Sequence, residues 1–299
     1  MTRGRAAGPA RHHLNFRRAA VLGVGMIGGS MAAALRRHGL AQVIVGYGPP
    51  DTLAEAGSLG LIDVAAGDVL EAVREADLVV LAAPIPALPG LLGAMAPGLS
   101  PDVVITDCAS TKRGVLAAAR AELGPLAGRF VAAHPIAGSE QSGPAAARAD
   151  LFDGCKLMLC ATDWADADAV ERVTALWAAL NTEVVPIDAE HHDRLYAELS
   201  HWPHAVAFAL SAAIADGGFA DEALRFSGGG LRDTTRIGAS SAPLWADILL
   251  DNRDAALASA DRFDAAMAAL RAALTAGDRA ALVALLARAS TWRRRLVRP

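Results

Sequence analysis

The sequence predicts two domains: an N-terminal α/β domain built on a doubly wound parallel sheet, and a C-terminal domain made only of helices. First, short apolar runs alternate with helical patterns between residues 19 and 187. Second, these runs lack strict polar alternation, which is typical of parallel strands buried on both faces. Third, the patterns after residue 188 are helical, with no convincing strand. A length of 299 residues fits two domains of about 150 residues each.

Composition excludes several classes of protein. Hydrophobic residues make up 53% of the chain and charged residues 20%, which excludes a disordered chain. The formal net charge of -4 creates no field for nucleic acid or an anionic membrane, so we expect neither as a partner. Every apolar run is interrupted before the about 18 residues of a membrane span. Three irregularly spaced cysteines fit a reducing compartment, so we expect a cytoplasmic protein without a bound metal.

The elements of the first domain follow in order along the chain. Residues 1–18 are basic and lack apolar periodicity, so we expect a disordered lead-in. A twin-arginine export signal is an alternative for Arg17 and Arg18, but the apolar stretch after them continues as a strand, a loop and a helix. The dinucleotide-binding domain is predicted to span 19–187. Its predicted strands are 19–22, 43–47, 78–83, 103–107, 130–134, 156–161 and 182–187, with a helix at about 165–180 before the last strand.

Residues 188–299 form the predicted helical domain. A helix is predicted at 204–215, and two apolar stripes at helical spacing follow, separated by a break at 276–278. The first stripe runs from Leu257 to Leu274. So many apolar faces favour burial between two subunits, and we expect a homodimer, although a monomeric bundle would produce the same pattern.

A glycine-rich turn follows the first predicted strand and opens a helix. In a GxGxxG pattern the first glycine permits a tight turn, the second lets the backbone approach a pyrophosphate, and the third allows close packing of helix on strand. The phosphate then meets the helix N-terminus. Because the turn lies in the first βα unit, dinucleotide binding is favoured over a merely structural turn. The residues of this turn that we predict to bind the cofactor are Gly23, Val24, Gly25, Met26, Ile27 and Gly28.

The end of the second predicted strand bears on the choice between NAD and NADP. A carboxylate about 20 residues after the glycines binds the adenine ribose of NAD. The sequence has Gly48 there, and the nearest acid, Asp51, is better interpreted as a turn or helix cap. No Arg or Lys stands nearby for a 2′-phosphate, so both cofactors stay open, with NAD slightly favoured. We also predict that Tyr47, Gly48, Ala83 and Pro84 contact the cofactor.

Further chemistry-bearing residues follow the later strands, at the edge where open parallel sheets bind ligands. His134 ends one of these strands, and imidazole changes its protonation near neutral pH. Its position supports two roles equally: a general base, and a histidine that caps a buried loop. His201 and His204 stand at a helix start, where packing is the alternative to a binding role.

Three glycines at 228–230 stand next to two arginines, Arg232 and Arg236. The glycines, Gly229 among them, allow close approach of a ligand, and guanidinium groups suit carboxylates. This pattern favours an anionic substrate, although Arg232 has the alternative of pairing with an acid such as Asp233.

Five segments together resemble the prephenate dehydrogenase family, which includes arogenate and cyclohexadienyl dehydrogenases. They are GVGMIGGS, DCASTK, HPIAGSEQSG, SHWPHAVAFAL and GGGLRDTTRIGASSAPLW, and they occur in the family's order between about residues 19 and 272. The resemblance implies a Rossmann-type domain, a helical dimerisation domain and an active site for a cyclohexadienyl acid. The implied reaction is oxidative decarboxylation of prephenate to 4-hydroxyphenylpyruvate, with hydride transfer to NAD or NADP, in tyrosine biosynthesis.

The resemblance also implies roles for residues in these segments. His134 matches the catalytic histidine, which accepts a proton or hydrogen bond from the ring hydroxyl and must therefore be neutral, so activity is expected to fall at acid pH. Ser110 matches a catalytic serine that binds the same hydroxyl. Arg236 matches the arginine that holds a substrate carboxylate.

The other matching positions are expected to bind substrate. His204, with His201 in the same Ser-His-x-Pro-His stretch, lines the pocket, and Gly229 lies in the glycine run. Glu140 matches an acidic gate. Trp245 matches an aromatic residue that can reach the partner subunit's site.

Alternatives to prephenate remain at this point. Arogenate and an aminated analogue of the 4-amino-4-deoxyprephenate type would undergo the same chemistry, and the Ser-His-x-Pro-His form favours prephenate mildly. A β-hydroxyacid dehydrogenase would need a lysine in the second domain, but Lys112 and Lys156 are the only lysines and both lie in the first. A non-catalytic nucleotide-binding sensor is opposed by the presence of Ser110, His134 and Arg236.

Overall fold

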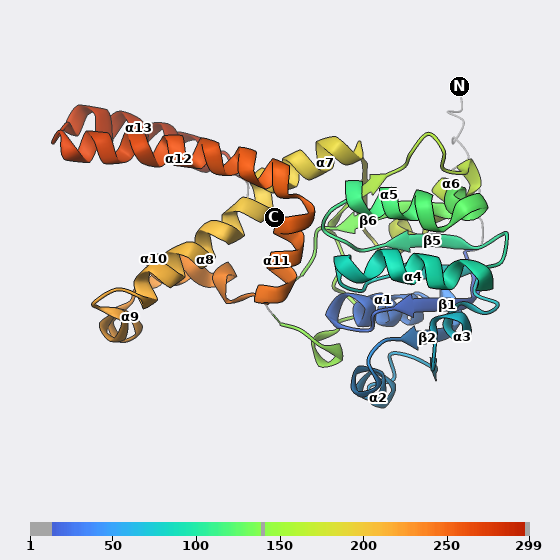
Figure 1. Cartoon of the computed structure of the whole chain (residues 1–299). Helices are drawn as coiled ribbons and strands as arrows, with labels where there is room; N and C mark the ends of the chain where they lie inside the picture. Colours follow the sequence, from blue (N-terminus) through green and yellow to red (C-terminus); the bar gives the residue numbers. More distant parts are fainter. Residues whose placement is uncertain (1–13, 139–140, 297–299) are drawn as a thin grey trace, which may run out of the picture.

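The structure is a computed structural model that describes residues 14–138 and 141–296. Within them, the N-terminal domain holds one sheet of eight strands in the order β3-β2-β1-β4-β5-β6-β7-β8 (Figure 1). Strands β1 to β6 run parallel, and this confirms the predicted doubly wound sheet. The strands are β1 (Phe16–Leu22), β2 (Ala41–Tyr47), β3 (Val64–Ala65), β4 (Leu78–Leu81), β5 (Val104–Asp107), β6 (Phe130–Pro135), β7 (Lys156–Cys160) and β8 (Glu183–Pro186).

Three features of the sheet differ from the prediction. Strand β7 runs antiparallel to β6. The described part of the connection between them forms a short 3-10 turn and no α-helix of the kind that usually returns a chain to a parallel strand. Strand β3 has two residues, too few to form an apolar run. Strand β1 begins at Phe16, so residues 16–18 are not part of a disordered lead-in. The side chain of Phe16 is buried, and the Asp77 carboxylate accepts the backbone N–H groups of Arg17 and Arg18.

Helices cover both faces of the sheet and enclose a core on each face. Helices α1, α2 and α6 pack on one face, and α3, α4 and α5 pack on the other. Neighbouring strand residues such as Val79 and Val80 belong to opposite cores, because side chains alternate along a strand. The helices of this domain are α1 (Met26–Arg37), α2 (Pro50–Ser58), α3 (Val69–Val73), α4 (Leu88–Met95), α5 (Arg113–Glu122) and α6 (Ala167–Ala179).

The second domain is helical throughout its described residues, as predicted. Its helices are α7 (Ala189–Tyr196), α8 (Trp202–Ala215), α9 (Ala220–Phe226), α10 (Gly229–Thr235), α11 (Ala242–Asp251), α12 (Arg253–Thr275) and α13 (Arg279–Arg293). Helices α12 and α13 form one arm that extends away from the sheet domain, and α8, α9 and α10 form a second arm (Figure 1). Helix α11 packs against the sheet domain through Trp245 and Ile248, which join the core on the α4 and α5 face.

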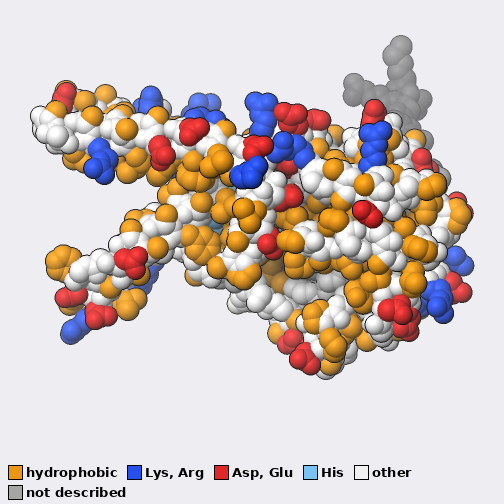
Figure 2. All heavy atoms as spheres, viewed as in Figure 1, with side chains coloured by type: hydrophobic (Ala, Val, Ile, Leu, Met, Phe, Trp, Pro, Cys, Tyr) orange, Lys and Arg blue, Asp and Glu red, His pale blue; other side chains and the backbone are white. Residues whose placement is uncertain are grey.

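The two arms carry much exposed apolar surface. Figure 2 shows hydrophobic side chains along both arms and on the surfaces that face one another. Leu274 on the first predicted stripe is 61% exposed, and Leu224 on the second arm is 84% exposed. The helical stripes found in the sequence are therefore not buried within a single chain. Over the described residues, no helix is long and apolar enough to cross a membrane.

Candidate active site

The glycine-rich turn joins β1 to α1 and forms a cradle of backbone. Gly23 has φ +100°, a conformation that favours glycine, and its N–H donates to the carbonyl oxygen of Tyr47 at 2.8 Å. A Cβ on Gly28 would lie 1.9 Å from the Gly23 carbonyl oxygen, so this helix can approach the turn only with glycine there. A Cβ on Gly25 would meet no described atom within 4 Å. The second glycine thus faces open space while the other two are enclosed.

The geometry of this turn fits a dinucleotide pyrophosphate. Helix α1 starts directly after Gly25, and Met26 and Ile27 belong to its first turn. That turn carries no acidic side chain, and its N-cap residue, Gly25, makes no side-chain cap. The positive end of the helix dipole favours an anion there. The residues present therefore fit the group that the sequence pattern predicts.

The remaining predicted cofactor residues adjoin the turn. A Cβ on Gly23 would lie 2.6 Å from the backbone nitrogen of Ala83, which precedes Pro84. A Cβ on Gly48 would lie 4.0 Å from the backbone nitrogen of Val24. The carboxyl ends of β1, β2 and β4 therefore meet around the turn.

The interpretation of Asp51 as a helix cap is wrong. Pro49 occupies the N-cap position of α2, and Asp51 lies inside the first turn with its side chain exposed. Helix α2 starts at Pro50 because proline has a φ suited to the first helical position.

A buried ion pair braces the ends of β5 and β6. The side chains of Asp107 and Lys112 are wholly buried and contact one another. The Asp107 carboxylate also accepts the N–H groups of Ala109 and Ala133, each at 2.9 Å, and Lys112 Nζ donates to the Ala133 carbonyl oxygen at 2.7 Å. The pair thus fixes the backbone immediately before His134.

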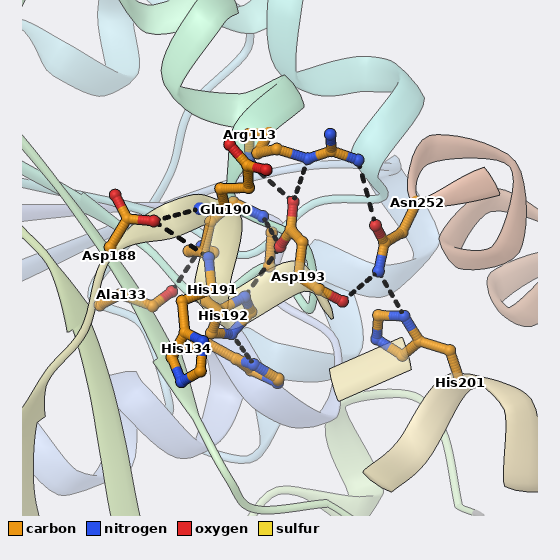
Figure 3. A network of polar contacts seen from close by, with 12 residues as sticks. Arg113, Ala133, His134, Asp188, Glu190, His191, His192, Asp193, His201 and Asn252 are labelled. Carbon is orange, nitrogen blue, oxygen red and sulfur yellow. Dashed lines mark hydrogen bonds and ion pairs between the residues drawn. The ribbon is translucent and has the colours of Figure 1, made fainter. Parts of the chain in front are cut away.

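His134 begins a chain of polar contacts into the helical domain (Figure 3). Its Nδ1 lies 2.9 Å from Nε2 of His192, and Nδ1 of His192 lies 2.8 Å from Oδ1 of Asp193. Both partners come from α7, which follows β8. His134 is half-buried, and His192 and Asp193 are buried.

Asp193 joins both domains. Its carboxylate accepts the backbone N–H groups of Lys112 and Arg113 at the start of α5, at 2.8 and 3.0 Å, and its Oδ2 forms an ion pair with the Arg113 guanidinium. Its carbonyl oxygen accepts a hydrogen bond from the Asn252 amide at 2.7 Å. The same amide nitrogen of Asn252 donates to Nδ1 of His201 at 3.1 Å. Asn252 lies between α11 and α12, so four segments meet at this point.

His204 lies one helical turn beyond His201, stacked on Trp245. The ring centroids are 3.5 Å apart with an interplanar angle of 17°. His204 Nδ1 donates to the Ser200 carbonyl oxygen at 2.8 Å, so its Nε2 is left as an acceptor. Trp245 is buried beneath His204 of its own chain, and its expected reach toward a partner's site stays a prediction. Helix α11 holds it there because Trp245 and Ile248 pack into the sheet domain.

Burial lowers the pKa of each histidine in this group. The pKa of His134 lies well below its usual value, first through burial and then through the charges of His192, Lys112 and His201. Burial also lowers the pKa of His192, lowers that of His201 to about 4, and lowers that of His204 with a contribution from the Arg236 charge. All four imidazoles are therefore neutral at pH 7, and each offers a proton acceptor.

Two family models cover most of the chain. The model described as the prephenate dehydrogenase nucleotide-binding domain matches residues 31–186, and the one described as the prephenate dehydrogenase dimerization domain matches residues 188–288. The chain belongs to the prephenate dehydrogenase family. The resemblance found in the five sequence segments is confirmed.

Relatives of this prephenate dehydrogenase family member agree with that assignment. The chain is 34% identical to a cyclohexadienyl dehydrogenase of Zymomonas mobilis, over 88% of this chain and 90% of the relative. It is 38% identical to a prephenate dehydrogenase of Bacillus subtilis, over 81% of this chain and 65% of the relative. Its fold matches the crystal structure of Aquifex aeolicus prephenate dehydrogenase in complex with hydroxyphenyl propionate and NAD+, with a TM-score of 0.86 and 30% identity, covering 94% and 98% of the two chains.

The structure places the other site residues of this family member as follows. Ser110 is half-buried in the loop between β5 and α5. Arg236 is exposed at the end of α10, and Gly229 is exposed at the start of the same helix. Arg232 donates to the Ser227 carbonyl oxygen at 3.3 Å. Glu140 lies outside the described residues.

Sequence reasoning missed the residues that hold the histidines. His192 and Asp193 follow the last predicted strand, and that position at a strand end was the signal that could have found them. Asn252 gave no signal, because a single asparagine between two helical patterns resembles an ordinary loop residue. In the described part of the chain, no group of three or more His, Cys, Asp or Glu residues is arranged to hold a metal.

Proposed function

We propose that this protein oxidatively decarboxylates prephenate to 4-hydroxyphenylpyruvate, with NAD as the preferred hydride acceptor. The observation that carries the proposal is a neutral His134 at the carboxyl end of β6, at the same sheet edge as the glycine cradle. Membership of the family, the NAD+ in the Aquifex aeolicus complex and the hydroxyphenyl ligand of that complex support it.

In the proposed mechanism, His134 acts on the ring hydroxyl. Bound NAD+ supplies the acceptor for the hydride that leaves the ring carbon bearing this hydroxyl. His134 accepts the hydroxyl proton as that carbon gains carbonyl character. Loss of the ring carboxylate as carbon dioxide moves the electron pair through the ring to the oxygen, which takes the proton back as a phenol. The ring becomes aromatic, so orientation and one positioned base are sufficient.

The other residues are proposed to orient the substrate. Arg236 binds a substrate carboxylate, because a guanidinium matches carboxylate geometry with two parallel hydrogen bonds. Ser110 donates to the ring hydroxyl oxygen from the loop after β5, and His204 offers its free Nε2 to the pocket. The gating role of Glu140 rests on the family resemblance alone.

We also propose that the active form is a homodimer. The description of the matched C-terminal model as a dimerization domain supports this assembly. So does the apolar surface of the two arms, where Phe219 and Leu224 are 78% and 84% exposed. The predicted cytoplasmic location stays a prediction.

The test is the formation of reduced nicotinamide by purified protein with prephenate and with arogenate, each paired with NAD and with NADP. We expect turnover with prephenate and NAD, and a loss of about 10²- to 10⁴-fold in kcat for His134→Asn. Turnover with arogenate alone would replace the proposed substrate. No turnover in any of the four combinations, while NAD still binds, would reject the proposed reaction.

A further inference from the structure

We propose that His192, oriented by Asp193, is a positioning residue that keeps Nε2 of His134 free of hydrogen and thus able to accept a proton. The inference rests on the proposed function for its catalytic consequence. The contact chain that carries it is present in the folded protein itself, from β6 through α7 to the start of α5 (Figure 3).

The Asp193 carboxylate, at one end of this chain of contacts, fixes the direction of each hydrogen bond in it. The Asp193 carboxylate pairs with the Arg113 guanidinium. Burial raises the pKa of Asp193, but the hydrogen bonds from His192 and from the backbone N–H groups of Arg113 and Lys112 outweigh it, so the pKa is lowered. An ionised carboxylate can only accept, so Nδ1 of His192 carries the hydrogen that meets Oδ1 of Asp193. The neutral His192 ring then has an unprotonated Nε2.

The same logic fixes His134. Nε2 of His192 is an acceptor, so Nδ1 of His134 must carry the hydrogen across the 2.9 Å contact. A neutral imidazole has one hydrogen, and Nε2 of His134 is therefore left with a lone pair. The arrangement has the logic of an Asp-His pair with a second imidazole inserted between the carboxylate and the base.

The ring packing holds this geometry. The His134 ring makes edge contacts with the rings of His192 and Tyr196, at centroid distances of 5.1 and 5.0 Å. His192 and Tyr196 also contact one another at 4.6 Å. Rotation of the His134 ring would therefore require displacement of two side chains of α7.

Charges around His134 favour a contribution from Asp193 when the base gains a proton. The groups that face it are His192 and Tyr196 from α7, Asp107 from the end of β5, Lys112 from the start of α5, and His201 from the turn before α8. The charge of Lys112 opposes a proton on His134, and Lys112 is itself paired with Asp107. Asp193 is the carboxylate that the hydrogen-bond chain connects to His134, and it stabilises the imidazolium through His192.

Two variants of His192 separate these effects. In His192→Gln, the amide oxygen comes near the position of Nε2 and still accepts from His134. In His192→Asn, the amide reaches only the position of Nδ1, so His134 loses its acceptor while contact with Asp193 is kept. His191→Asn is the matched control, because His191 is the exposed neighbour on the same helix.

We expect His192→Asn to lower kcat for prephenate by about 10²-fold or more, with KM and NAD affinity unchanged. His192→Gln is expected to recover most of that loss, and His191→Asn to match the unaltered protein. The acid limb of the kcat/KM profile is expected at lower pH in His192→Asn, because the proton on His134 loses its link to Asp193. Equal kcat in His192→Asn and the unaltered protein, or no difference between the Asn and Gln variants, would overturn the inference.

A spectroscopic test reads the tautomer of His134 without substrate. In protein labelled with ¹⁵N-histidine, the ring correlations report which nitrogen carries hydrogen, and His134→Asn assigns the His134 signals. We expect the Nδ1–H tautomer in the unaltered protein and the Nε2–H tautomer in His192→Asn. An Nε2–H tautomer in the unaltered protein would overturn the inference. The Nδ1–H tautomer in a protein that fails to convert prephenate would instead reject the proposed reaction.

Discussion

The chain has two lysines, and both pair with carboxylates, so they form a matched comparison of buried and exposed ion pairs. Lys112 and Asp107 are each 0% exposed, whereas Lys156 and Glu183 are 55% and 63% exposed at 2.6 Å. Removing one partner of a buried pair costs about 3–5 kcal/mol, and an exposed pair contributes about 0–1 kcal/mol. Asp107 keeps two backbone donors, which favours the lower end of the first range. We therefore expect Lys112→Met to lower the free energy of unfolding by about 3 kcal/mol, and Lys156→Met by less than about 1 kcal/mol.

The assay is urea unfolding followed by tryptophan fluorescence at one fixed protein concentration, because dimerisation makes stability depend on concentration. The double variant Asp107→Asn with Lys112→Met should be more stable than Lys112→Met alone. It removes the unpaired charge and keeps an oxygen for one of the two N–H groups of Ala109 and Ala133, which the carboxylate accepts on separate oxygens. Equal destabilisation by the two lysine variants would refute the argument from burial. A double variant less stable than Lys112→Met would refute the assignment of the cost to an unpaired charge.

Three further predictions follow from the turn, a buried histidine and the exposed arginine. Gly28→Ala should destabilise the fold, since its Cβ would lie 1.9 Å from the Gly23 carbonyl oxygen, whereas Gly25→Ala should keep its melting temperature and weaken NAD binding in a titration. The pKa of His201 is about 4 when folded against a usual 6.5, so the unfolded chain binds more protons between those values. Stability should fall as pH drops through that window, by roughly 3 kcal/mol, and His201→Gln should flatten the fall in urea titrations. Arg236→Lys should raise KM for prephenate at least about tenfold with a smaller change in kcat, because an ammonium cannot form the bidentate pair; an unchanged KM would contradict a carboxylate contact.

The sequence predicted those strands and turns whose structure depends on neighbouring residues alone. The buried strand β4 consists of continuous apolar residues, and the glycine turn needs its glycines for steric reasons found within one βα unit. The reversal of β7 depends on what the chain does between residues 136 and 155, where no periodic pattern decides the direction. Strand β3 has two residues and contributes too little burial to produce a pattern.

The candidate site was predicted in part for a similar reason. His134 stands at a strand end, a position that indicates ligand binding in any parallel sheet, whereas its partners come from segments 58 residues and more along the chain. Nothing in the sequence pairs His192 with His134, or Asn252 with His201. Those contacts arise only when α7 and the start of α12 pack against the end of the sheet. Trp245 depends on packing in the same way. The sequence identifies it as a candidate site residue, but the side chain's surroundings are set by how α11 packs on the sheet domain.

The polarity of the chain of contacts explains why the helical domain bears on chemistry in the sheet domain. The Asp193 carboxylate accepts backbone N–H groups from the start of α5, and it can only accept a hydrogen bond from His192 as well. His192 must therefore accept its other hydrogen bond from His134. The donors that orient Asp193 lie at the start of α5, directly after the loop that carries Ser110, so one segment holds both the serine and the anchor of the histidines. A displacement of α7 relative to this loop would release the tautomer of His134 without touching its backbone. The ability of His134 to act as the proposed base therefore depends on how α7 packs against the sheet. A variant that loosens this contact should lower kcat more than it lowers the affinity for NAD.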